Sequence, residues 1–219
     1  VFTFYQSKYF SAITGLMASQ HFARMAPHDD EAEVLRGGLL LSYGLHREAG
    51  DIFAKLIEQS AALSVRNRAW FYLAKIRFQR DLPTEAQAAL ARIEGALVGE
   101  LQEERVLLQA QLQMASGDNT GAANTLRTHS QGDKASRYAL FNLGVALIKG
   151  GQGDQGRAML NQLGSTPADD EEQRSLRDKA NVALGYAALQ DSRPADARTA
   201  LQRVRLTSLH ANKALLGFG

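Results

Sequence analysis

"LFNLGVALIKGGQGDQGRAMLNQLG", residues 140–164, places a glycine-rich run between two segments with apolar residues at helical spacing. Within it, residues 151–156 spell GxGxxG, which is associated with dinucleotide binding when a strand precedes it and a helix follows. Here the preceding segment has apolar residues at i, i+3 and i+7, which predicts a helix and not a strand. We therefore interpret GQGDQG as an interhelical turn. A nucleotide-binding enzyme is the alternative, since Glu171 supplies an acidic residue 20 positions after Gly151.

The same stretch supplies a spacing rule. From Gly144, another small residue follows after 12 positions at Gly156, and apolar residues follow after 16 and 19 at Leu160 and Leu163. Intervals of 37, 36, 34 and 41 residues separate the starting residues that obey this rule, which are Gly37, Ala74, Ala110, Gly144 and Gly185. The chain is thus a tandem repeat of helix-turn-helix elements. A small residue at the crossing point lets the two helices of one repeat approach closely.

These repeats resemble the tetratricopeptide repeat, a helix-turn-helix module of about 34 residues. The stretches that carry the resemblance best are AWFYLAKIRFQRDLPTEAQAALARI (69–93), FNLGVALIKGGQGDQGRAMLNQLGSTP (141–167) and ANVALGYAALQDSRPADARTALQRV (180–204). The resemblance implies an all-α fold, a right-handed α-solenoid of about six repeats. The longer intervals depart from the family and predict longer connections or extended first helices.

We expect one solenoid over residues 1–219. Its approximate repeats are 1–28, 29–64, 65–99, 100–132, 133–168 and 169–208, with 209–219 opening a further one. In this register the chain begins and ends inside first helices. We therefore expect a segment of a longer array, because each repeat needs a neighbour to cover its apolar face.

The amino-acid composition argues against several classes of function. Lys and Arg number 25 against 23 Asp and Glu, a net charge of +2, which argues against nucleic acid as the partner. No cysteine is present, so disulfides and thiolate catalysis are excluded, and a bacterial periplasm or cell envelope is compatible. No apolar run reaches the 18 or more residues of a membrane span.

Two acidic runs are candidate metal sites: HDDEAE at 28–33 and ADDEEQ at 168–173. Each follows a proline, and carboxylates stabilise the first turn of a helix, so we interpret both as helix starts. The second run falls in the longest interval, which predicts a longer first helix there. The histidines are scattered, and no catalytic motif occurs. We predict no cofactor, no metal and no catalysis.

The resemblance also implies that the first helices form a concave wall that binds a peptide or a partner helix. Positions six and three before each small residue, and one and four after it, are expected on that wall. Side chains there are apolar and aromatic, with charges mainly along one edge, which favours an apolar ligand over the carboxylate clamp of some relatives. The predicted partner-binding residues are Arg68, Phe71, Lys75, Phe78, Leu107, Gln111, Met114, Tyr138, Phe141, Lys179 and Tyr186.

We accordingly predict a non-enzymatic scaffold that binds an apolar helix or extended segment of a partner protein, with Phe71, Phe78, Phe141 and Tyr186 as anchors. In one alternative, some of these side chains pack between neighbouring first helices instead. In another, the chain is the helical arm of a larger envelope enzyme whose catalytic domain lies outside this stretch.

Overall fold

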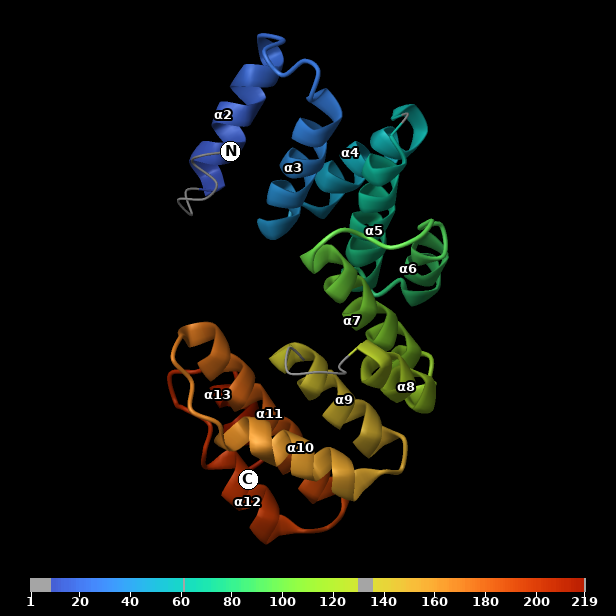
Figure 1. The fold of residues 1–219 in the computed structure, drawn as a ribbon. Helices are drawn as coiled ribbons and strands as arrows, with labels where there is room; N and C mark the ends of the chain where they lie inside the picture. Colours follow the sequence, from blue (N-terminus) through green and yellow to red (C-terminus); the bar gives the residue numbers. More distant parts are fainter. Residues whose placement is uncertain (1–8, 61, 130–135, 219) are drawn as a thin grey trace. The chain divides into compact units, whose positions relative to one another are not determined.

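The computed structural model describes residues 9–60, 62–129 and 136–218, and within these ranges it contains helices and turns but no strand (Figure 1). The helices are α2 (Tyr9–His21), α3 (Asp29–Ser42), α4 (His46–Gln59), α5 (Leu63–Gln79), α6 (Pro83–Leu90), α7 (Glu100–Ala115), α8 (Asn119–His129), α9 (Arg137–Lys149), α10 (Gly153–Ser165), α11 (Glu171–Gln190), α12 (Pro194–Leu201) and α13 (Ala211–Leu216). Consecutive helices pack on one another from α2 through α6 and from α8 through α12. The prediction of an all-helical, tetratricopeptide-like fold is confirmed.

One turn recurs between the helices of each pair. Three residues join α3 to α4, α5 to α6, α7 to α8, α9 to α10 and α11 to α12. The middle residue is left-handed each time: Gly44 (φ 75°), Asp81 (60°), Gly117 (86°), Gly151 (82°) and Ser192 (57°). The third residue donates its N–H to the carbonyl five positions earlier, as in Gln152 to Leu147 at 2.8 Å. This hydrogen bond satisfies one of the carbonyls left open at the helix end.

The spacing rule has a direct physical basis. The apolar residue 16 positions after the small residue fills the space where a side chain is missing. A Cβ added to the small residue would meet it at 2.6 Å for Gly37 against Phe53, 2.8 Å for Gly144 against Leu160, and 2.5 Å for Gly185 against Leu201. These three apolar side chains are buried. The spacing rule therefore reflects close packing: at each of these three crossings, the apolar side chain fits into the hole left by the glycine.

GQGDQG contains the end of the turn that the sequence predicts and the first residues of α10. Helix α9 precedes it and ends at Lys149, Gly150 is the C-cap, and α10 begins at Gly153. Gly156 then lies at the helix crossing, where an added Cβ would be 2.5 Å from the carbonyl oxygen of Gly144. A dinucleotide-binding motif requires a strand before the glycines, and here a helix precedes them. The structure therefore does not support the nucleotide-binding alternative.

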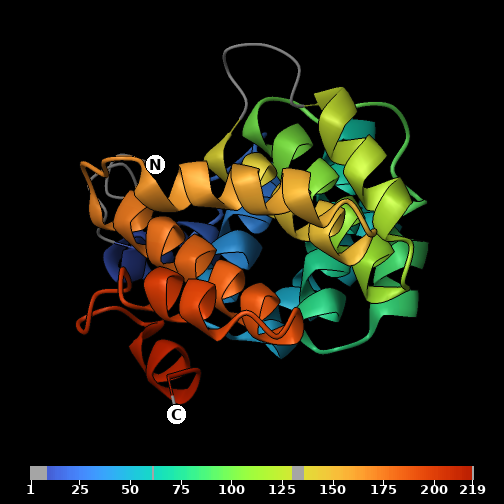
Figure 2. The same cartoon turned by 90° about the horizontal axis from the view of Figure 1, so that it is seen from below.

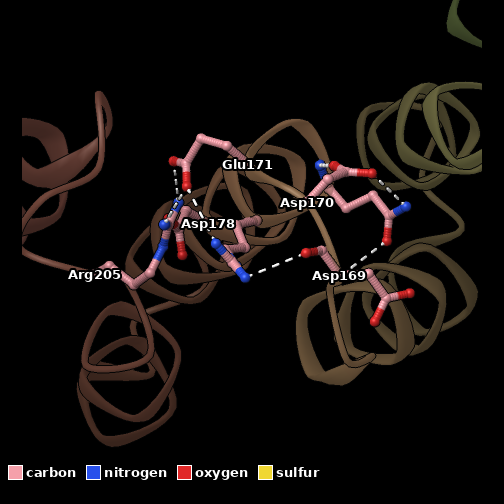
Figure 3. Close-up of polar contacts among 7 residues, drawn as sticks. Asp169, Asp170, Glu171, Asp178 and Arg205 are labelled. Carbon is pink, nitrogen blue, oxygen red and sulfur yellow. Dashed lines mark hydrogen bonds and ion pairs between the residues drawn. The ribbon is translucent and has the colours of Figure 1, made fainter.

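Both acidic runs open helices, as predicted. Helix α3 begins at Asp29 and α11 at Glu171. Before α11, Asp170 accepts a hydrogen bond from the Gln173 backbone N–H at 2.7 Å, and the Gln173 side chain donates to Asp170 at 2.8 Å (Figure 3). Both hydrogen bonds run from Gln173 to the side chain of Asp170, which is the N-cap of α11. Helix α11 has 20 residues, so the longest interval does contain a longer first helix.

The chain divides into two compact units, an N-terminal unit of residues 1–105 and a C-terminal unit of residues 106–219. In the N-terminal unit, α3, α4 and α5 share an apolar core around Phe53. In the C-terminal unit, the packing continues from α9 through α10 and α11 to α12 (Figures 1 and 2). A single continuous solenoid stays a prediction. None of the described helices combines the length and apolar character needed to cross a membrane.

Candidate partner-binding surface

A cleft of about 560 Å³ runs along α3 in the N-terminal unit, and we call it the α3 cleft. Its lining comes from α3, the turn after it, α5 and the first residues of α7. The residues are Val34, Leu35, Gly38, Leu39, Ser42, Tyr43, Arg68, Tyr72, Lys75 and Glu104. A second hollow of about 570 Å³ between α2 and α3 shares Leu35 and Arg68 with it. The two hollows therefore adjoin along α3.

The α3 side of the cleft is largely apolar, and the Tyr72 ring and charged side chains line its other side. Val34 and Leu39 are buried, and Gly38 has no side chain to fill the space above them. The Tyr72 ring stacks on Phe53, with centroids 4.9 Å apart, and this stacking fixes its direction. Burial, followed by the charge of Glu104, raises the pKa of the Tyr72 phenol. The phenol therefore stays neutral at physiological pH and can both donate and accept a hydrogen bond.

Two ion pairs lie beside this lining. Arg68 pairs with Glu31, and Lys75 Nζ lies 2.6 Å from Glu104 Oε2. Each pair joins successive first helices, α3 to α5 and α5 to α7. Because these side chains are partly exposed, each pair contributes about 0 to 1 kcal/mol to stability. Their main consequence is that both cations of the α3 cleft are already neutralised.

Among the predicted binding residues, Arg68 and Lys75 line the α3 cleft. Phe71 and Phe141 do not lie open on a wall, since their exposed fractions are 1% and 7%. Phe141 packs with Leu160 in an apolar cluster of the C-terminal unit. Both rings are therefore buried in this fold. The wall register rests on helical angle alone, and it does not reveal how far a neighbouring helix covers each position.

The other predicted residues are spread along later helices. Phe78, Leu107, Gln111 and Met114 are half-buried, and none of them lines the α3 cleft. Leu107 and Met114 pack against the core between α7, α8 and α9 in the C-terminal unit. These four residues are not brought together with Arg68 and Lys75 in that cleft. A role for them in binding stays a prediction.

In the C-terminal unit, predicted wall residues bridge successive first helices. The Tyr138 hydroxyl of α9 donates to Glu172 Oε1 of α11 at 2.9 Å. Burial, followed by this hydrogen bond, raises the pKa of Tyr138 to about 12. Lys179 Nζ lies 4.8 Å from the Phe141 ring centroid, within cation–π range. The Tyr186 hydroxyl donates to the Lys213 carbonyl at 3.0 Å and so links α11 to α13.

Sequence reasoning missed Leu35 and Tyr72, which both line the α3 cleft. Each stands two residues before the small residue of its repeat, at Gly37 and Ala74. The signal was available, because a large side chain recurs at this position in two adjacent repeats. The predicted wall positions, six and three before the small residue and one and four after it, do not include this position.

A buried carboxylate organises the end of the C-terminal unit (Figure 3). Asp178 of α11 is fully buried, and its Oδ2 accepts a hydrogen bond from Arg205 Nε at 2.8 Å. Arg205 also donates two hydrogen bonds of 2.9 Å to Glu171. Hydrogen bonding to Arg205 holds the pKa of the Glu171 carboxyl below its usual value. This bidentate contact ties the segment after α12 back onto α11.

Comparison with known proteins agrees with this geometry. Residues 113–180, from the end of α7 into α11, match the family described as Tetratricopeptide repeat. The match supports assignment to the tetratricopeptide repeat family. Repeats of this family generally mediate protein–protein interactions. No curated protein matches the chain.

Proposed function

We propose that the protein is a non-enzymatic scaffold that binds an apolar helix or extended segment of a partner protein, and that the α3 cleft receives it in the N-terminal unit. The observation that carries this proposal is the open space above Gly38, flanked by Val34, Leu35 and Leu39. A cleft of about 560 Å³ falls within the roughly 300–1,000 Å³ of common ligand sites.

The charges of the α3 cleft support an apolar ligand over an acidic one. Arg68 and Lys75 each already have a carboxylate partner, Glu31 and Glu104. A terminal carboxylate would have to displace one of these partners. An apolar side chain instead removes aliphatic surface from water, at about 25 cal/mol per Å². The Tyr72 hydroxyl is placed to hydrogen-bond the backbone of a bound segment.

Filling the α3 cleft tests the proposal. Gly38→Leu places a side chain in the open space, because an added Cβ meets nothing closer than the Tyr72 hydroxyl at 3.8 Å. Gly50→Leu is the matched control, since Gly50 lies in α4 with nothing within 4 Å of an added Cβ. Peptides are selected by display on the unmodified chain, and their affinities for both variants are then measured by fluorescence polarisation.

We expect the selected peptides to carry apolar residues at helical or alternating spacing and to bind Gly38→Leu at least about tenfold more weakly, as for one lost apolar anchor. Binding to Gly50→Leu should be unchanged. If the peptides bind Gly38→Leu and the unmodified chain equally, the α3 cleft is not the binding site.

A further inference from the structure

A hollow of about 350 Å³ lies in the C-terminal unit, and we call it the α10–α12 hollow. Helix α11 packs against both α10 and α12, and all three helices contribute side chains to the lining. Leu184, Ala188 and Ala200 are buried and give the hollow an apolar base. Three arginines also line it, and they differ in how their charge is compensated.

Two of these arginines are already neutralised by carboxylates. Asp191 Oδ2 accepts hydrogen bonds from Arg157 Nη1 at 2.7 Å and from Arg193 Nη2 at 3.1 Å. Arg157 Nη2 also donates to Asp154 Oδ1 at 2.6 Å, and Arg193 Nη1 lies 3.5 Å from Asp196 Oδ2. Three carboxylates thus compensate two guanidinium groups, which leaves neither arginine available to a further anion.

The third arginine, Arg203, is held by neutral groups. Its Nη1 donates to Asn161 Oδ1 at 2.7 Å and to Ser165 Oγ at 3.3 Å, and both acceptors belong to α10. Among the residues that the structure describes, Arg203 forms no ion pair with a carboxylate, and neither of these contacts uses Nε or Nη2. Those two nitrogens form the edge of the guanidinium that can donate two parallel hydrogen bonds to one carboxylate.

The surroundings of Arg203 favour a ligand with a single negative charge. Asp154 and Asp196 line the same hollow and Asp191 bridges two of its arginines, so a phosphate group with a charge of about −1.5 to −2 meets more repulsion than a carboxylate. A volume of about 350 Å³ is at the lower end of the roughly 300–1,000 Å³ of common ligand sites, which suits one side chain. The apolar base can cover the methylene groups of that side chain.

We propose that the α10–α12 hollow binds an acidic side chain of a partner protein, with the carboxylate on Arg203 and the aliphatic stem against Leu184 and Ala200. Asn161 and Ser165 hold the guanidinium in place before the ligand arrives, which reduces the entropy lost on binding. This site belongs to the C-terminal unit and takes a ligand of opposite character to that of the α3 cleft. It therefore goes beyond the proposed function, and the two fail separately.

The probe is an acetylated and amidated peptide in which Glu alternates with Ala. A matched peptide carries Gln in place of Glu, and a third carries Gln with a free terminal carboxylate. Binding to the full chain is followed by NMR at low ionic strength, through the Nε–H resonance of Arg203. Arg203→Lys keeps the charge but removes the two-donor edge, and Ala158→Leu fills the hollow from α10. The matched controls are Arg47→Lys and Ala54→Leu, at exposed positions of α4.

We expect the Glu peptide to shift the Arg203 resonance and to bind more tightly than both Gln peptides. Arg203→Lys and Ala158→Leu should each weaken binding about fivefold, although neither changes the net charge. Arg47→Lys, Ala54→Leu and Gly38→Leu should leave the affinity unchanged. Circular dichroism confirms that each variant is folded.

Equal binding of the Glu and amidated Gln peptides, including no measurable binding of either, would overturn the proposal. Preference for the free terminal carboxylate over the Glu side chain would also overturn it, because the ligand would then be a chain end. Full affinity of Arg203→Lys and Ala158→Leu for the Glu peptide would show attraction to charge elsewhere on the chain and would equally contradict binding in the α10–α12 hollow.

Discussion

Gly156 meets Gly144 so closely that a Cβ at position 156 would lie 2.5 Å from the Gly144 carbonyl oxygen. Helices α9 and α10 thus cross backbone to backbone. Gly156→Ala must push the helices apart, and we expect it to lower the free energy of unfolding by about 1–3 kcal/mol. Urea denaturation followed by circular dichroism measures this loss. Gly50→Ala, which meets nothing within 4 Å, should instead be neutral or stabilising.

Adjacent glycines in α3 should respond in opposite directions. An added Cβ at Gly37 would lie 2.6 Å from the buried Phe53 ring, whereas at Gly38 the nearest atom is 3.8 Å away. Gly37→Ala should lower the free energy of unfolding by about 1–3 kcal/mol. Gly38→Ala should raise it by up to about 1 kcal/mol, because alanine favours the helix. Similar unfolding midpoints for the two variants would contradict the described crossing of α3 and α4.

Two phenylalanines of α5 differ in burial, and substituting each one tests which of them belongs to the core. Phe71 is 1% exposed, and Phe78 is half-buried. Phe71→Ala should therefore lower the free energy of unfolding by about 3–5 kcal/mol, and Phe78→Ala by clearly less. Thermal and urea unfolding of both variants provide the comparison. An equal loss, or a larger loss for Phe78→Ala, would show that Phe71 is not the deeper of the two side chains.

The Glu171 and Arg205 pair predicts a dependence of stability on pH. The pKa of Glu171 is lowered from its usual 4.5 in the fold, so the unfolded chain takes up a proton first as the pH falls. The pair therefore stabilises the fold above about pH 4.5, and this contribution is lost as the pH falls through the folded pKa.

Urea midpoints between pH 3 and pH 7 should show Glu171→Gln less stable than the unmodified chain at neutral pH, with the difference shrinking in acid. Glu48→Gln, an exposed substitution in α4, controls for the change of charge. A difference between Glu171→Gln and the unmodified chain that stays constant across this range would argue against the ion pair as its cause.

The helices and their crossings could be predicted because their determinants lie close together in the chain. A knob 16 residues after its hole, as for Leu160 on Gly144, is fixed once two short helices and a three-residue turn are specified. The turn is equally local, since the left-handed residue and its hydrogen bond fall within six residues of each other. For this reason the sequence alone is sufficient to predict the turn at Gly151 and Gln152.

The candidate sites depend on longer separations. Lys75 and Glu104 are 29 residues apart, and Arg205 and Asp178 are 27 apart. Whether such residues meet depends on how one helix pair stacks on the next, which helical periodicity does not encode. Phe71 and Phe141 occupy positions predicted for an open wall, yet neighbouring packing buries both.

The sequence by itself therefore determined the repeat, the helix pairs, their turns and the residues at each crossing, because these follow from local periodicity and side-chain size. The tertiary structure alone decided which wall residues stay accessible, opened the α3 cleft beside Gly38, and paired Arg68 and Lys75 with carboxylates of neighbouring first helices. Accessibility and charge pairing are properties of neighbouring repeats, and no single repeat specifies them.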